Sequence, residues 1–148
     1  MATERAQTKI LVIDDENTFR LFLEETLRNA GMAPVTFGNP TEALPHVVRV
    51  AFDLVLTDLR MPGMNGMELI RAVRAIDPEL PIVMMSAHGN VDDAMAAIRE
   101  GANDYLTKPF LSAEFLFRLR LALRAASQTK EIERLSRDLG AVRDLDGM

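Results

Sequence analysis

Short apolar runs and longer amphipathic stretches follow one another along the chain. Each run is four to six residues long and lies between turn-forming residues, a pattern typical of buried strands in a parallel sheet. The five runs are Lys9–Ile13, Pro34–Phe37, Phe52–Thr57, Pro81–Ser86 and Asp104–Thr107. The stretches between them have apolar residues at helical spacing, so the pattern predicts an alternation of strands and helices.

The helix boundaries are predicted from capping residues. The first helix, Glu16–Asn29, ends before Gly31, and Asn39 with Pro40 forms the start of a second helix. Pro45 lies inside this second helix, removes one backbone donor and predicts a kink. The remaining helices are predicted at Gly66–Ile76, at Val91–Arg99 and from Ser112 onward. The alternation predicts an α/β fold, a doubly wound parallel sheet with helices on both faces.

The last predicted helix is longer than a domain of this size. Seven positions at spacings of four and three residues form a heptad seam, namely Leu121, Ala125, Gln128, Ile132, Leu135, Leu139 and Val142. A helix from Ser112 to Leu139 would be about 42 Å long, so its end should project, with fraying after Gly140. The positions beside the seam form no obvious charge pairs. A solvated tail packed on its own domain is therefore the alternative to a coiled coil.

Composition fits one domain followed by this extension. The 148 residues, 48% of them hydrophobic, suffice for a sizeable core, and we expect a tail at 1–8, a domain at 9–123 and a helical extension at 124–148. The net charge of −5 gives no general affinity for nucleic acid, and without cysteine there is no disulfide or thiol chemistry. No apolar signal segment or membrane-spanning run is found, so we expect a cytoplasmic protein with no membrane partner.

Three acidic residues lie at the ends of two predicted strands. Asp14 and Asp15 follow the first strand, and Asp58 follows the third. Ligands of open α/β sheets bind beyond the carboxyl ends of the strands, where these acids should converge. Because like charges repel unless a cation or proton offsets them, the pattern suggests a divalent metal ion and phosphate chemistry.

Four motifs occur in order at the ends of predicted strands. They are Asp14-Asp15, Thr57-Asp58-Leu59-Arg60-Met61-Pro62-Gly63, Ser86-Ala87 and Lys108-Pro109-Phe110. Together they resemble the signature of response-regulator receiver domains, the CheY-like family, over about Lys9 to Leu123. The segment from Ala87 through Tyr105 is most similar to receivers of the NtrC group. The resemblance implies a flavodoxin-like sheet of five parallel strands in the order 2-1-3-4-5.

The resemblance also implies a phosphoacceptor site. Asp58 would accept a phosphoryl group from a sensor histidine kinase, and Mg²⁺ would be held by Asp14, Asp15, Asp58 and the backbone carbonyl of Arg60. Such a protein catalyses only its own phosphorylation and dephosphorylation and is not otherwise an enzyme. Taken singly, these acids could equally be helix-capping or turn residues.

Further roles follow from the same resemblance. Lys108 would contact Asp58 and then the phosphoryl group, and the Lys108–Pro109 peptide bond would be cis. Ser86 would donate a hydrogen bond to a phosphoryl oxygen. Tyr105 would turn inward when Ser86 moves, which would switch the surface formed by the fourth helix, fifth strand and fifth helix. A surface lysine, a strand-ending serine and a half-buried strand tyrosine are the simpler interpretations.

Arg60 and His88 resemble positions that tune hydrolysis of the aspartyl phosphate, although a loop histidine is more often only solvent-exposed. The heptad seam, alone or with the switch surface, would form a homodimer. The chain would be a free-standing regulator or the regulatory part of an NtrC-type transcriptional activator.

Two other functions are compatible with the acidic site. An aspartate-nucleophile, Mg²⁺-dependent phosphatase has a second acid two residues after its nucleophile, and here Arg60 occupies that position. An inert receiver could serve as a dimerisation module, but the complete set of acids with Ser86 and Lys108 argues against it.

Overall fold

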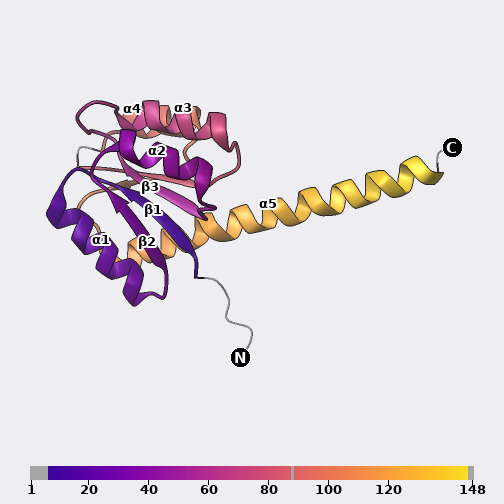
Figure 1. Cartoon of the computed structure of the whole chain (residues 1–148), viewed down its shortest axis with the longest axis horizontal. Helices are drawn as coiled ribbons and strands as arrows, with labels where there is room; N and C mark the ends of the chain where they lie inside the picture. Colours follow the sequence, from indigo (N-terminus) through magenta and orange to yellow (C-terminus); the bar gives the residue numbers. More distant parts are fainter. Residues whose placement is uncertain (1–6, 88, 147–148) are drawn as a thin grey trace.

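The computed structural model describes residues 7–87 and 89–146, with side chains up to residue 139, and Figure 1 shows its alternating strands and helices. The strands are β1 (Lys9–Ile13), β2 (Ala33–Phe37), β3 (Leu54–Asp58), β4 (Ile82–Ser86) and β5 (Asp104–Thr107). The helices are α1 (Asn17–Asn29), α2 (Pro40–Arg49), α3 (Gly66–Ile76), α4 (Val91–Glu100) and α5 (Ser112–Asp146). Apart from the C-terminal end of α5, each lies within two residues of its predicted range.

The five strands form one parallel sheet in the order β2-β1-β3-β4-β5, which confirms the predicted flavodoxin-like fold. In the register of β1 and β3, Ile13 is opposite Thr57, and in that of β3 and β4, Asp58 is opposite Met85. The carboxyl ends of the three central strands are therefore level with one another. Residues that follow these strands meet at one edge of the sheet.

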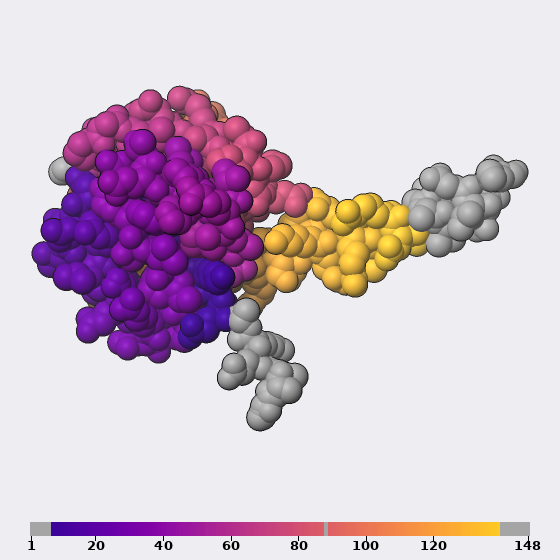
Figure 2. Space-filling view, in the orientation of Figure 1, coloured from indigo at the N-terminus to yellow at the C-terminus, as the bar shows by residue number. Residues whose placement is uncertain are grey.

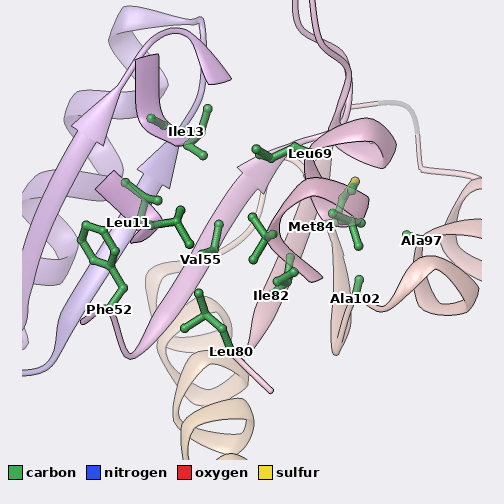
Figure 3. Packing of buried hydrophobic residues seen from close by; sticks show 14 of the residues in the cluster. Leu11, Ile13, Phe52, Val55, Leu69, Leu80, Ile82, Met84, Ala97 and Ala102 are labelled. Atoms are coloured by element: carbon green, nitrogen blue, oxygen red, sulfur yellow. The ribbon is translucent and has the colours of Figure 1, made fainter. Parts of the chain in front are cut away.

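The three central strands are buried on both faces because their side chains alternate between two cores. One core packs Leu11, Val55 and Met84 against residues of α2, α3 and α4, as Figure 3 shows for Leu69 of α3. The other packs alternate strand residues against α1 and the beginning of α5. Its fully buried members include Ile10, Val12, Leu54, Leu56, Leu23, Leu27, Phe115 and Leu119. The helices on both faces thus shield the sheet from solvent.

Side-chain caps determine where three helices begin. The side chain of Asn39 accepts a hydrogen bond from the Thr41 backbone at 2.7 Å, and Pro40 occupies the first turn of α2, as predicted. A reciprocal capping box joins Asn65 and Glu68 at the start of α3, and Asn90 caps α4. α2 is assigned as a single helix through Pro45, from Pro40 to Arg49.

α5 begins in the domain and then leaves it. Phe115 and Leu119 are fully buried, whereas Ile132, Leu135 and Leu139 are 63%, 49% and 65% exposed. The helix projects from the globular part (Figures 1 and 2) and runs to Asp146, past the predicted end at Leu139. Gly140 lowers helix propensity by about 1 kcal/mol but does not by itself end a helix. No helix in residues 7–87 and 89–146 has both the length and the apolar character needed to cross a membrane.

Candidate functional site

The three predicted acids meet at the carboxyl ends of β1 and β3. Asp14 and Asp15 directly follow β1, and Asp58 is the last residue of β3. One carboxylate oxygen from each lies within 4.8 Å of the others. Asp14 is fully buried, Asp58 is 8% exposed, and Asp15 is exposed to solvent. The structure therefore brings together a cluster with two shielded carboxylates and one open one.

Lys108 joins the two shielded carboxylates. Its Nζ lies 2.7 Å from Oδ2 of Asp14 and 3.3 Å from Oδ2 of Asp58, and its side chain is only 11% exposed. The opposite oxygens are bound by the backbone, because Glu16 N–H donates to Oδ1 of Asp14 and Leu59 N–H donates to Oδ1 of Asp58, each at 2.9 Å. Lys108 reaches this position from the loop after β5.

The strand ends hold the backbone of Lys108. Its N–H donates to the carbonyl of Ser86 at 2.8 Å, and the Lys108–Pro109 peptide bond is cis. This contact continues the β4–β5 pairing, in which Ser86 is opposite Thr107. The predicted site residues of the first, third, fourth and fifth strands thus come together at one edge.

Burial is the main influence on the Asp58 carboxyl and raises its pKa above the ordinary value. The Lys108 ammonium opposes this rise, the neighbouring Asp14 carboxylate adds to it, and the Leu59 N–H again lowers the pKa. The carboxylate of Asp58 is therefore held in an environment that favours additional positive charge beside it.

An aromatic side chain that the sequence did not single out completes the surroundings of Lys108. The Nζ atom lies 4.2 Å from the centroid of the Phe19 ring. Phe19 lies at helical spacing with Phe22, Leu23 and Leu27, a pattern that by itself predicts core packing. Its position four residues after Asp15, in the first turn of α1, places it near the loop that carries Asp14 and Asp15 but does not by itself reveal a contact with Lys108.

Ser86 and Tyr105 lie on neighbouring strands beside the acids. Ser86 ends β4 and is 1% exposed, and Tyr105 pairs with Met84 two residues earlier in β4. The Tyr105 ring packs against the core beneath α2, α3 and α4. Its hydroxyl is buried and is the one such side-chain group of the described residues that has no hydrogen-bond partner.

Arg60 and Gly66 lie in the loop after Asp58 and at the start of α3. The Arg60 guanidinium is exposed and pairs with Asp93 of α4 at 3.4 Å. A Cβ on Gly66 would lie 2.7 Å from the backbone oxygen of Asp58, so only glycine allows α3 to approach β3 this closely. His88, the other predicted tuning residue, lies outside the described residues.

The comparisons with known proteins agree with this geometry. The family model of the response regulator receiver domain matches residues 10–120. The chain belongs to this family. Receiver domains are signalling domains of response regulators, and the similar curated proteins are named as regulators.

Two curated relatives illustrate the similarity. The C4-dicarboxylate transport transcriptional regulatory protein DctD of Rhizobium meliloti is 35% identical over 95% of this chain and 36% of its own length. The DNA-binding transcriptional regulator NtrC of Escherichia coli K12 is 41% identical over 68% of this chain and 22% of its own length. The receiver is thus close to the NtrC group, and the chain spans roughly a fifth to a third of these relatives.

Solved structures support the same assignment. NtrX from Brucella abortus superimposes with a TM-score of 0.84 at 32% identity, covering 88% of this chain and 30% of that chain. A CheY-like receiver domain protein from Methanospirillum hungatei gives a TM-score of 0.80 at 21% identity, covering 84% of this chain and 99% of that chain, and supports the fold alone.

Proposed function

We propose that this chain is the phosphoacceptor of a two-component system and that Asp58 accepts a phosphoryl group from a sensor histidine kinase. The observation that supports this most directly is the position of the Lys108 ammonium between Asp14 and Asp58. One oxygen of Asp58 is bound by the Leu59 N–H, and the other faces Lys108. A carboxylate in this position is fixed in space at the open edge of the sheet, as an in-line displacement requires.

The reaction follows from these groups. A carboxylate oxygen of Asp58 attacks the phosphorus of a phosphohistidine, a P–O bond forms, and the P–N bond breaks as the imidazole leaves. Lys108 then pairs with the phosphoryl oxygens, and the Ser86 hydroxyl donates to one of them. Hydrolysis of the aspartyl phosphate returns the free carboxylate, so the chain catalyses only its own modification and its reversal.

The acids fit a bound Mg²⁺ ion. Three carboxylates lie together, and Lys108 supplies one positive charge to them, which leaves two negative charges. Oxygen donors of this kind are those that Mg²⁺ prefers. Asp14, Asp15, Asp58 and the backbone carbonyl of Arg60 would hold the ion, and when bound it would neutralise charge on the phosphoryl oxygens.

Ser86 and Tyr105 would convert phosphorylation into a change of shape. A buried Tyr105 hydroxyl without a partner has an unsatisfied donor, so a shift of the neighbouring loop that offers an acceptor would stabilise the inward ring. The affected surface comprises α4, β5 and α5, where Asp104 of β5 pairs with Arg118 of α5 at 2.7 Å. Arg60 and His88 would tune the lifetime of the phosphorylated state.

The remaining parts of the proposal concern the whole regulator. Residues 9–123 would form the receiver and residues 124–148 a dimerising extension toward an output module. The low coverage of DctD and NtrC supports a chain that acts as the regulatory part of a longer NtrC-type activator. A homodimer would form through the exposed seam of α5, alone or with the α4-β5-α5 surface.

Labelling with acetyl phosphate and Mg²⁺ tests the central proposal. We expect the wild-type chain to incorporate one phosphoryl group, the Asp58→Ala variant to incorporate none, and chelation of Mg²⁺ by EDTA to abolish labelling. Phosphorylation can be followed on phosphate-affinity gels.

Three results would contradict the proposal. Equal labelling of Asp58→Ala would exclude Asp58 as the acceptor. Rapid turnover of small phosphate esters would indicate a phosphatase. No labelling, together with no binding of Mg²⁺ at millimolar concentration, would indicate an inert receiver.

A further inference from the structure

We propose that Phe19 is a positioning residue for Lys108, an inference that rests on the proposed phosphoacceptor function. The ammonium of Lys108 has three N–H donors and a flexible four-carbon stem. Two carboxylates, Asp14 and Asp58, take up one side of this group, and the Phe19 ring lies 4.2 Å from it. The ring thus supplies a further wall of the site that holds the ammonium.

The aromatic face attracts the ammonium rather than merely filling space. The ring quadrupole draws a cation toward its face at distances up to about 6 Å, and this attraction grows as water is excluded. Lys108 is nearer to Asp14 than to Asp58, at 2.7 Å against 3.3 Å. A group that restricts the ammonium therefore decides how long it stays within reach of Asp58, where the phosphoryl group would be transferred.

The ring itself is held by other aromatic residues. Phe19 makes an edge contact with Phe110 at 5.5 Å between centroids and a tilted contact with Phe22 at 5.6 Å. Phe110 stacks on the fully buried Phe115 of α5 at 5.2 Å. Since Phe110 is two residues after Lys108, the ring that holds Phe19 and the lysine that Phe19 contacts belong to the same loop. The orientation of Phe19 is thereby fixed with respect to Lys108.

A packing role alone makes a different prediction. Phe19 and Phe22 both belong to the aromatic cluster, but it is the Phe19 ring that lies beside the Lys108 ammonium. If Phe19 only filled volume, leucine would replace it as well as tyrosine does, and replacement of Phe22 would have the same effect. If its ring positions the ammonium, tyrosine should retain the function and leucine should not.

Two measurements on the whole chain test this inference. In NMR spectra, the ε-methylene protons of Lys108, assigned by their loss in Lys108→Arg, should be shifted upfield by the Phe19 ring. This shift should disappear in Phe19→Leu and remain in Phe19→Tyr. With acetyl phosphate and Mg²⁺, Phe19→Leu should be phosphorylated roughly two- to thirtyfold more slowly than wild type, the range of a cation–π contact. Phe19→Tyr and the matched control Phe22→Leu should stay within about twofold.

A double variant separates positioning from folding. In the Lys108→Met background, Phe19→Leu should cause no further loss of rate, because the ammonium that it positions is gone. An undiminished loss in that background, or a wild-type rate for Phe19→Leu alone, would overturn the inference. The lysine shift requires no phosphorylation. Wild-type protein that shows the shift but is never labelled would therefore refute the proposed function and leave the Phe19–Lys108 contact standing.

Discussion

Gly66 shows how one residue without a side chain positions the acceptor. It opens α3, and its N–H donates to the Leu59 carbonyl at 2.7 Å, directly after Asp58. A Cβ would lie 2.7 Å from the Asp58 oxygen, 2.9 Å from Leu59 Cα and 2.9 Å from Met84 Cε. Two of these neighbours are backbone atoms, so they cannot move aside without displacing the end of β3.

The substitution Gly66→Ala should therefore affect stability and function together. We expect the free energy of unfolding to fall by about 1–3 kcal/mol, the usual cost of overpacking a close contact. We also expect slower phosphorylation by acetyl phosphate, because the backbone that carries Asp58 must shift. Urea unfolding and the labelling rate measure the two effects.

Gly38→Ala is a matched control for this prediction. A Cβ at Gly38 would meet the guanidinium of Arg20 at 2.9 Å, and this flexible side chain can move only by loosening its hydrogen bond to the Asp14 carbonyl at 2.6 Å. The free energy of unfolding should therefore fall by no more than about 0.5–1.5 kcal/mol, the net contribution of one hydrogen bond. If Gly66→Ala were as stable and as reactive as wild type, the close approach of α3 to β3 would not matter for the site.

The charged residues of the site were easier to predict from the sequence than the residues that position them. Asp14 and Asp58 could be found because acids after apolar runs conflict with burial unless a positive charge offsets them, whereas Lys108 was implied by the resemblance to receiver domains. The role of Phe19 could not be found, because an apolar residue at helical spacing predicts core packing whether or not a cation lies over its ring. The contact depends on the arrangement of α1 and the β5–α5 loop, which no local pattern contains.

At the scale of elements, Arg74 joins the loops at the edge of the sheet opposite the site. From α3 it donates to the carbonyl of Gly101 at 2.6 and 3.1 Å, to that of Leu80 at 2.6 Å, and to that of Asp77 at 3.2 Å. It also donates to the Asn103 side chain at 3.1 Å. Burial lowers the pKa of Arg74, so its charge has lost hydration and depends on these acceptors. The alternation of strands and helices was predictable, but this connection between α3, β4 and β5 was not.

Replacing Arg74 by methionine should destabilise the fold without changing the chemistry. Several partly buried carbonyls would lose a charged donor, and we expect the free energy of unfolding to fall by about 2–3 kcal/mol. The labelling rate of folded protein should stay unchanged, because the Arg74 contacts lie at the amino-terminal edge of β4 and β5. Urea unfolding measures the stability. Acetyl phosphate labelling, carried out below the unfolding transition, measures the rate.

Arg71→Met is the control for Arg74→Met. Arg71 lies on the same helix and makes a two-point contact with Glu100 at 2.9 and 3.0 Å, but on the exposed surface. Exposed ion pairs contribute little to stability, so this variant should unfold close to wild type. Equal destabilisation by both substitutions would show that the carbonyl contacts of Arg74 contribute no more to stability than an exposed ion pair does.

At the scale of the whole molecule, α5 connects the site to the part of the helix that projects from the domain. Its beginning lies in the core through Phe115, which stacks on Phe110 two residues after Lys108. Its projecting part exposes Ile132, Leu135 and Leu139 on the heptad seam, the part of the fold that a sequence pattern alone predicted as an interface. A second copy of the chain, as in the proposed homodimer, would cover this apolar surface.

The substitution Leu135→Glu should dissociate such a dimer. Each copy would lose the burial of one leucine, worth about 1.5–3 kcal/mol, so the dissociation constant should rise at least about a hundredfold. Arg137→Glu is the control, because it changes the charge more but lies two residues off the seam, and it should leave the dimer intact. Sedimentation equilibrium with and without beryllofluoride and Mg²⁺ measures both variants and shows whether the phosphorylated state favours the dimer. A wild-type chain that stays monomeric at hundreds of micromolar under both conditions would contradict the proposed dimer, and the seam would then have to pack on another protein.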